Sequence, residues 1–337
     1  MSLEESNRML DFFPRLLTII LTLFFLMICG YICRKTKIID NNASKSLSRL
    51  IVTIGQPMMI IGALNNVKFS QENLTVAWQV LLISLVIHLL MAAIALVICK
   101  PMRKKELNRA KVFEFSLVFA NVGFIGFPIL DSIFGNGIGS FMGAFYVVVF
   151  NIFLWTWGIM ILAREREDIK LTPKKIIINY GTVPCAIGIL LFLLQPYIVP
   201  AEGSVLAPAY NALSQFFNYL GSLCTPISVL VTGALLATMP LSDMFKNGKL
   251  YLHSGIKLIV FPVILCLLAK VVGLNDTYVL LVTAMAGVPS AAMVTMLAEL
   301  HDIEPGYASQ SVGMTSILST ATLPLVMLLA QWVTQLW

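Results

Sequence analysis

Two short stretches of an otherwise apolar chain combine polar residues with helix breakers, and such a combination can bind a ligand. The first is Ala120–Leu130, ANVGFIGFPIL, which contains Asn121, Gly123, Gly126 and Pro128. The glycines weaken a helix, and Pro128 lacks the N–H that closes a helical turn. In hydrocarbon, a broken helix survives only where protein covers the freed backbone groups or water reaches them. This stretch is therefore a candidate binding site.

The second stretch, Ala286–Ser290, lies in the other half of the chain and contains Gly287, Val288, Pro289 and Ser290. Interrupted apolar segments at matching places in two halves indicate a transporter's midplane site. The helices that resume after the breaks, at Pro128 and at Ser290, would direct their N-termini at the midplane. Because helix N-termini attract anions, we predict an anionic ligand bound also by Asn121 and Ser290, with the glycines allowing close backbone approach. Simple proline kinks are the alternative.

Other polar residues inside apolar segments are further candidates. They could line the cavity or form hydrogen bonds between helices; they are Gln56, Asn151, Thr225, Gln310 and Thr315. His88 is a candidate for proton coupling, because imidazole titrates near neutral pH, although a neutral packing role fits the sequence equally well.

The remaining charged residues in or near these segments have ordinary explanations. Lys257 is expected to extend to the membrane interface. Solvation at segment ends is expected for Glu114, Asp131 and Glu299.

Composition indicates an all-α polytopic membrane protein. The chain of 337 residues is 58% hydrophobic and 12% charged, with a mean hydropathy of +0.87, whereas soluble domains carry about 25% charged residues. The net charge of +6 would suggest nucleic acid, but its distribution along the chain points to lipid instead. The six cysteines include no Cys-x-x-Cys pair and no histidine at metal spacing. We expect no metal site and no cofactor.

Ten apolar segments, spans one to ten, are long enough to cross a bilayer. Lys and Arg gather in the odd-numbered connections, so the positive-inside rule predicts that these are cytoplasmic and that both termini lie outside. Anionic lipid is the expected contact of the basic residues. We expect the protein in the inner (plasma) membrane. The spans lie near residues 12–33, 46–66, 74–99, 112–135, 139–163, 174–195, 210–238, 250–271, 277–301 and 306–334.

The ten spans divide into two sets of five, residues 1–165 and 166–337, whose odd number forces opposite orientations. Span two carries Gln56-Pro57 followed by Gly62-Ala63-Leu64, and span seven carries Thr225-Pro226 followed by Gly233-Ala234-Leu235. Spans four and nine carry the breaks. This placement predicts an inverted repeat, with chance recurrence of Pro and Gly as the alternative.

The motifs that are missing argue against an enzyme. The sequence has no Walker loop, no His-Glu-x-x-His site and no Gly-x-Ser-x-Gly elbow, so ATP-driven pumping and hydrolytic chemistry are not expected.

The Asn121–Pro128 stretch, the Gly287-Val288-Pro289 break and the spans with Pro57 and Pro226 resemble the auxin efflux carrier family, which includes bacterial malate and malonate permeases and the plant PIN exporters. The resemblance covers nearly the whole chain. It implies the bile-acid-symporter-like fold, with ten helices in two inverted five-helix repeats and spans four and nine crossing.

It also implies a scaffold of spans one, two, six and seven, often a homodimer interface, and a transport domain of spans three to five and eight to ten that moves as an elevator. The short central loop favours a bacterial organic-acid carrier. Sodium ligands of related symporters cannot be placed on this sequence.

The sequence thus predicts a secondary transporter of a small organic anion, a dicarboxylate such as malate or malonate or an auxin-like acid. The alternative is a membrane sensor that binds a ligand or lipid at the same crossover without moving it. A measured flux distinguishes the two.

Overall fold

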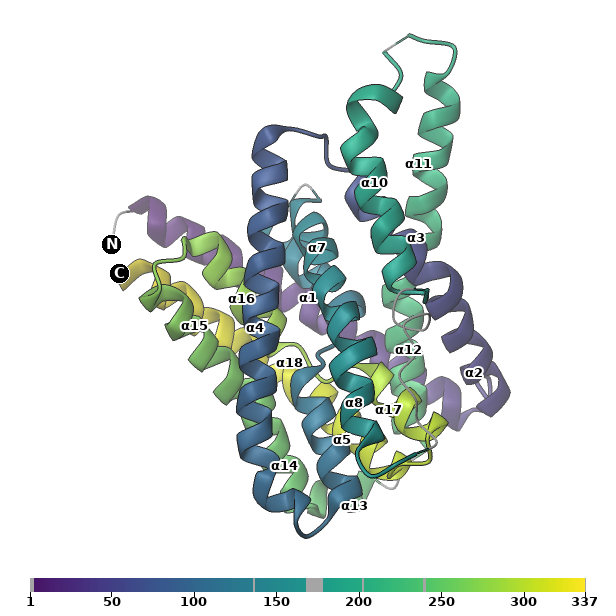
Figure 1. Cartoon of the computed structure of the whole chain (residues 1–337), viewed down its shortest axis with the longest axis vertical. Helices are drawn as coiled ribbons and strands as arrows, with labels where there is room; N and C mark the ends of the chain where they lie inside the picture. Colours follow the sequence, from purple (N-terminus) through teal and green to yellow (C-terminus); the bar gives the residue numbers. More distant parts are fainter. Residues whose placement is uncertain (1–2, 136, 168–177, 202, 239–240, 337) are drawn as a thin grey trace.

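The computed structural model describes residues 3–135, 137–167, 178–201, 203–238 and 241–336. Within these ranges the chain is helical, with no strand and a single isolated β-bridge. The prediction of an all-α membrane protein is confirmed at this level. Helix α18 (Pro305–Leu336) packs against helices of residues 107–118 and 248–300, whereas the helices of residues 182–198 and 207–222 extend away from it at the top of Figure 1.

The first half of the chain contains α1 (Leu3–Lys35), α2 (Asn41–Leu50), η1 (Ile51–Gly55), α3 (Gln56–Asn65), α4 (Gln71–Arg103), α5 (Leu107–Val118), η2 (Val122–Gly126), α6 (Phe127–Phe134), α7 (Ile138–Phe153), η3 (Leu154–Gly158) and α8 (Ile159–Ala163). The second half contains α10 (Thr182–Ile198), α11 (Ala207–Ser222), α12 (Cys224–Leu236), α13 (Leu241–Lys246), α14 (Gly248–Gly255), η4 (Ile256–Val260), α15 (Phe261–Val271), α16 (Asp276–Gly287), α17 (Ala292–Leu300) and α18 (Pro305–Leu336). The η elements are π-helical turns that continue the neighbouring helices.

Among the described residues, seven continuous helical stretches are long and apolar enough to cross a membrane, and three apolar helices are shorter. These shorter helices, Val122–Phe134, Thr182–Ile198 and Asp276–Gly287, overlap predicted spans four, six and nine. Residues 174–177, the predicted start of span six, lie outside the described residues. The shortness of the helices in spans four and nine follows from the breaks, since each of these spans consists of two helices.

Three of the π turns precede prolines and explain how the helices tolerate them. Pro57, Pro128 and Pro262 each lie two residues after the end of a π turn. In an α-helix, a proline clashes with the carbonyl four residues earlier. In all three cases that carbonyl lies within the π turn, where hydrogen bonds join residues five positions apart instead of four. The α-helix α6 begins at Phe127, next to the predicted Pro128, but the half-helix as a whole begins earlier, with η2 at Val122. The break lies at residues 119–121, and Pro128 is in the first turn of α6.

Two glycines allow α1 and α12 to pack with their backbones in contact. A Cβ atom at Gly30 would lie 1.9 Å from the Leu230 carbonyl oxygen, and one at Gly233 would lie 1.9 Å from that of Met27. No side chain fits at such distances, so any larger residue would separate the helices. This is the small-residue packing that membrane helices use.

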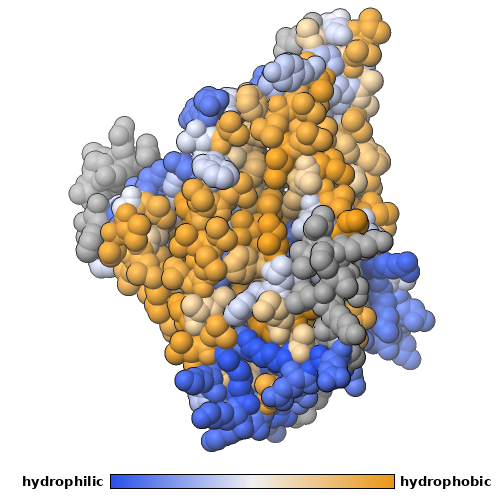
Figure 2. All heavy atoms as spheres, viewed as in Figure 1, coloured by the Kyte–Doolittle hydropathy of each residue, from blue (hydrophilic) through white to orange (hydrophobic). Residues whose placement is uncertain are grey.

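The surface matches a position in a bilayer. Figure 2 shows an apolar belt across the face in view, which is consistent with exposed residues such as Trp78 (62%) and Val97 (73%). Hydrophilic residues gather at one end, over α2 and over the connections between α4 and α5 and between α13 and α14. An apolar belt of this kind is covered by lipid chains.

Glu114 departs from the expectation of ordinary solvation. Its side chain is fully buried and accepts hydrogen bonds from both Nη atoms of Arg164, at 2.5 and 2.7 Å. The Arg103 Nε atom lies 3.3 Å away. The expectation for Glu114 is wrong because two guanidinium groups pair with its carboxylate. Their attraction offsets the free-energy cost of removing the carboxylate from water.

The other two acidic residues lie near the surface. Asp131 accepts a hydrogen bond from the Ser140 backbone N–H at 2.7 Å and another from the Ser140 hydroxyl, which helps to cap α7. Glu299 is exposed, as expected.

Candidate functional site

The structure brings the two predicted breaks into direct contact. The Asn121 N–H donates to the Pro289 carbonyl at 2.7 Å, and the Ala291 N–H donates to the Phe119 carbonyl at 2.9 Å. Together these bonds form an antiparallel bridge between Ala120 and Ser290. Each break thus satisfies backbone groups that the other leaves free, as a broken helix inside a membrane requires.

Ser290 holds this crossover together from the side. Its hydroxyl donates to the Ser116 carbonyl at 2.9 Å, and its backbone N–H donates to the Thr315 hydroxyl oxygen at 3.2 Å. Because α5 ends at Val118, the Ser116 carbonyl belongs to the last turn, whose carbonyls lack partners within the helix. Ser290 is fully buried. In this conformation its hydroxyl is bound to protein.

Asn121 has a different environment. Its backbone carbonyl accepts hydrogen bonds from the N–H groups of Ile125 and Gly126, both at 3.2 Å, at the start of η2. Its side chain is 7% exposed, and its amide has no hydrogen-bond partner among the described residues. The carboxamide can therefore bind a ligand without first breaking a bond to the protein.

The glycines of the two stretches lie against side chains of other helices. A Cβ atom at Gly126 would lie 3.0 Å from the Met285 sulfur, and one at Gly287 would lie 3.0 Å from Leu323 Cδ1. Gly123 is less crowded, with Met59 Cε at 3.6 Å. Of the predicted site residues that remain in these stretches, Val288 and Pro289 are buried, whereas Pro128 is partly exposed.

Two small cavities lie against the half-helices that follow the breaks. The larger, of about 30 Å³, lies between α1, the η2–α6 half-helix, α12 and α18, and the smaller, of about 10 Å³, lies between α12, α17 and α18. Thr232 lines both, and Ala292, the first residue of α17, lines the smaller one. A water molecule needs at least about 10–15 Å³ of such space. In this conformation the larger cavity admits water but not an organic acid.

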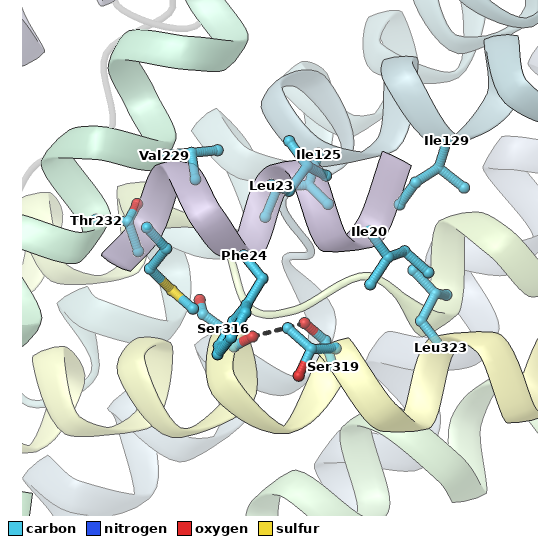
Figure 3. A pocket seen from close by; sticks show the side chains of 12 residues that line it. Ile20, Leu23, Phe24, Ile125, Ile129, Val229, Thr232, Ser316, Ser319 and Leu323 are labelled. Carbon is cyan, nitrogen blue, oxygen red and sulfur yellow. Dashed lines mark hydrogen bonds between the residues drawn. The ribbon is translucent and has the colours of Figure 1, made fainter. Parts of the chain in front are cut away.

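The polar lining of the larger cavity comes mainly from hydroxyl groups. Figure 3 shows Ser316 and Ser319 of α18 facing α1, with Thr232 of α12 beside them. The hydroxyl of Ser319 donates to the Ser316 carbonyl at 2.8 Å, and that of Thr232 donates to the Ser228 carbonyl at 2.8 Å. Rotation of such a hydroxyl exchanges a carbonyl of its own helix for an incoming oxygen atom.

Sequence reasoning did not single out these lining residues, although a signal was present. The polar residues Ser311, Thr315, Ser316, Ser319 and Thr320 recur at helical spacing, which places them along one stripe of α18. That stripe contains the crossover contact of Thr315 and three residues of the cavity, including Thr320.

Neither cavity is lined by any of the predicted site residues, Asn121 and Ser290 included. Gln56 at the start of α3 and Gln310 in α18 are partly buried, and neither lines either cavity. Asn151 in α7 is 2% exposed, and its Nδ2 atom lies 3.8 Å from the Cys185 sulfur, against α10. The crossover and these three side chains are thus separate features of this conformation.

His88 is enclosed by aromatic rings in the middle of α4. It is 1% exposed, and its Nδ1 atom lies 2.7 Å from the Ser84 carbonyl oxygen. Since a carbonyl only accepts, Nδ1 must carry a proton. Ring centroids of Tyr146 and Phe153 lie 5.1 and 5.3 Å away. This environment is that of a hydrogen-bonded packing residue.

Lys257 does not reach the membrane interface, so the expectation that it would extend there is wrong. Its side chain is fully buried, and Nζ has no hydrogen-bond partner among the described residues. Lys257 is buried because it lies on the face of η4 that points into the helical bundle. Ile259 and Val260 occupy the outward face, at 47% and 41% exposure, whereas Lys257 and Leu258 point into the bundle.

Two broken apolar helices that pair at their breaks inside a helical bundle define a class of polytopic membrane protein, and secondary carriers have this arrangement. The chain belongs to the membrane transport protein family, whose sequence model matches residues 16–327. The expected membership of the auxin efflux carrier family is thereby confirmed. The chain is also similar to an uncharacterized transporter of Methanothermobacter thermautotrophicus, with 21% identity over 308 residues that cover 91% of this chain and 95% of that protein.

Proposed function

We propose that this transporter is a secondary carrier that moves a small organic anion by alternating access, with the anion held at the crossover. The observation that carries the proposal is the Asn121 amide, which has no partner among the described residues and lies at the N-terminus of the η2–α6 half-helix, whose Ile125 and Ile129 line the larger cavity. An amide N–H and a helix N-terminus both favour a carboxylate. A dicarboxylate such as malate or malonate, or an auxin-like acid, has this chemistry.

The second half-helix supplies a matching group. The α17 helix begins at Ala292, directly after the crossover, and Ala292 lines the smaller cavity. An anion between the two cavities would be near both N-termini and near Thr232, which lines both. Because the cavities admit only water, the anion enters when α18 and η2–α6 separate from α1 and α12.

This separation fits an elevator in a ten-span, two-repeat architecture with units 1–165 and 166–337. One side of the larger cavity is formed by spans one and seven, which belong to the proposed scaffold. The other side is formed by spans four and ten, which belong to the proposed transport domain. The backbone contacts of Gly30 and Gly233 join two scaffold helices. A homodimer through the scaffold completes the proposal.

We further propose an inner (plasma) membrane location with both termini outside. Figure 2 shows a hydrophilic end of the molecule, and the connections at this end are rich in Lys and Arg. This supports a cytoplasmic assignment for this end and contact with anionic lipid.

Uptake into liposomes that contain the purified protein tests the proposal. Labelled malate, malonate and an indole acid would each be offered with and without a pH gradient, and empty liposomes would serve as the control. Saturable uptake of one acid is expected. If an acid binds but none crosses, the carrier is refuted, and a sensor that binds its ligand at the crossover takes its place.

Asn121→Ala tests the site itself. A hydrogen bond to a charged group contributes about 1.5–3 kcal/mol, so affinity for the transported acid should fall roughly 10- to 150-fold. Because the amide bonds no protein group, expression and thermal stability should stay at the wild-type level. Wild-type affinity in a well-folded Asn121→Ala protein would remove Asn121 from the site.

A further inference from the structure

A chain of buried polar groups runs from the crossover into α14. The Ser290 hydroxyl donates to the Ser116 carbonyl, and the Ser116 hydroxyl oxygen lies 2.7 Å from His253 Nε2. Ser116 also donates to the Phe113 carbonyl at 3.1 Å. Because that bond uses the hydroxyl proton, the histidine donates through Nε2, and its Nδ1 atom is an acceptor.

Two complementary groups at the end of this chain are unpartnered. His253 Nδ1, an acceptor, and Lys257 Nζ, a donor, have no hydrogen-bond partner among the described residues, and both side chains are 0% exposed. They lie four residues apart, which places them near one face of the helix. A buried ammonium group without a counter-charge is costly.

The local backbone marks this position as well. Lys257 lies in η4, the π turn before Pro262, and η4 packs against α14, α15, α16 and α18. Single π turns inside helices are frequent at functional sites. A lysine held there is enclosed by the helices that carry the crossover and the cavity lining.

The other titratable groups of the elements packed against η4 contact different partners or are exposed. They are Lys249 and Tyr251 of α14, Cys266 and Lys270 of α15, Asp276 and Tyr278 of α16, and Tyr307 of α18. Within the described chain, His253 is therefore the titratable group of these elements that stays unpartnered near Lys257.

We propose that Lys257 is the proton-binding group of this carrier, so that one proton crosses with each organic anion. This inference rests on the proposed anion transport. When the crossover is empty, the amine is neutral. When an anion binds, the Nζ lone pair takes a proton from water and the ammonium compensates the negative charge. On the other side the anion leaves and the proton returns to water.

The physical advantage lies in the charge that crosses the hydrocarbon. A net charge in the bilayer is expensive. When no substrate is bound, the Lys257 amine is neutral and adds no charge to the transport domain. When substrate is bound, the Lys257 ammonium offsets one negative charge of the anion. Anion and proton then favour each other's binding, because linkage is reciprocal.

Proteoliposomes with an alkaline interior test the inference on the acid that the wild type transports. A difference of one pH unit is a tenfold ratio of proton concentration across the membrane. At one proton per anion, the acid should therefore accumulate inside the liposomes by up to about tenfold. Lys257→Arg keeps a permanent charge. It should still exchange labelled for unlabelled acid at equal pH, but lose gradient-driven accumulation. Lys257→Met, which cannot titrate, should also lose the gradient response and bind the anion more weakly.

Lys270→Met is the matched control, because Lys270 follows in the same span and pairs with Asp276 at 2.8 Å. It should retain both exchange and accumulation. Undiminished accumulation by folded Lys257→Arg overturns the inference, as does loss of the gradient response in His88→Gln alone. If the wild type exchanges an acid but ignores the gradient, Lys257 loses this role and the carrier stands. If no acid crosses at all, the carrier fails and its coupling fails with it.

Discussion

Ser290→Ala should lower the stability of the protein, whereas Asn121→Ala should leave it unchanged, although the two residues lie at the same crossover. The alanine at position 290 removes a buried hydrogen bond of 2.9 Å and leaves the Ser116 carbonyl, in the last turn of α5, without that donor. Losing such a bond and stranding its acceptor costs about 1–3 kcal/mol. Measured values inside membranes lie at the lower end of this range. We therefore expect about 1–2 kcal/mol, or a roughly 5- to 30-fold change in the ratio of folded to unfolded protein.

Unfolding by SDS in mixed micelles measures this loss, because tertiary contacts break there while helices largely persist. Ser254→Ala is the matched control: Ser254 is 1% exposed and its hydroxyl has no partner in the described chain, so its removal should change stability little. Equal midpoints for Ser290→Ala and Ser254→Ala would refute the view that the Ser290 hydroxyl holds the crossover together.

Two further predictions concern charges at the hydrophilic end. Glu114→Gln removes the buried partner of Arg164 and should destabilise the protein by about 3 kcal/mol or less, because both arginines near it are partly exposed; an unchanged SDS midpoint would contradict this. A hydrogen bond from Lys249 at 2.5 Å, followed by smaller effects, lowers the pKa of Glu106. Its stabilising effect is thus present above the usual glutamate pKa of about 4.3 and is lost as the pH falls through the lowered value. Stability of Glu106→Gln should therefore show less acid dependence than the wild type.

Most of the helical architecture could be predicted because it depends on local rules. Long apolar runs gave the boundaries of continuous spans within a few residues, as for α14–α15 at Gly248–Val271 against the predicted 250–271. The rule was less exact at Pro128, where a π turn precedes the proline and the half-helix begins earlier, at Val122. Sequence alone does not show which carbonyl will lose its hydrogen bond at a proline. Packing against neighbouring helices decides whether an α-helical turn becomes a π turn.

The site was harder to predict because its key facts are pairings between distant residues. The residues next to Asn121 and Ser290 in the sequence do not show that the Asn121 amide is free while the Ser290 hydroxyl is hydrogen-bonded. The difference depends on which groups of the other half of the chain lie within reach of each side chain. The same holds for Glu114, whose partner Arg164 is fifty residues away. Lys257 points inward because of the face on which η4 places it. A π turn shifts that face by one residue, which a regular helical period does not reveal.

The bonds around the crossover also indicate which parts of the molecule can move together. Two backbone hydrogen bonds, the Ser290 hydroxyl and the Thr315 hydroxyl tie spans four, nine and ten to one another. Among the described residues, no hydrogen bond joins the α1 and α12 residues of the larger cavity to those of η2–α6 and α18, where apolar side chains and helix-bonded hydroxyls meet. Sliding along this boundary breaks van der Waals contacts, whereas separating spans four and nine would expose several backbone groups to hydrocarbon. The physical costs thus favour a crossover that moves as one body past α1 and α12.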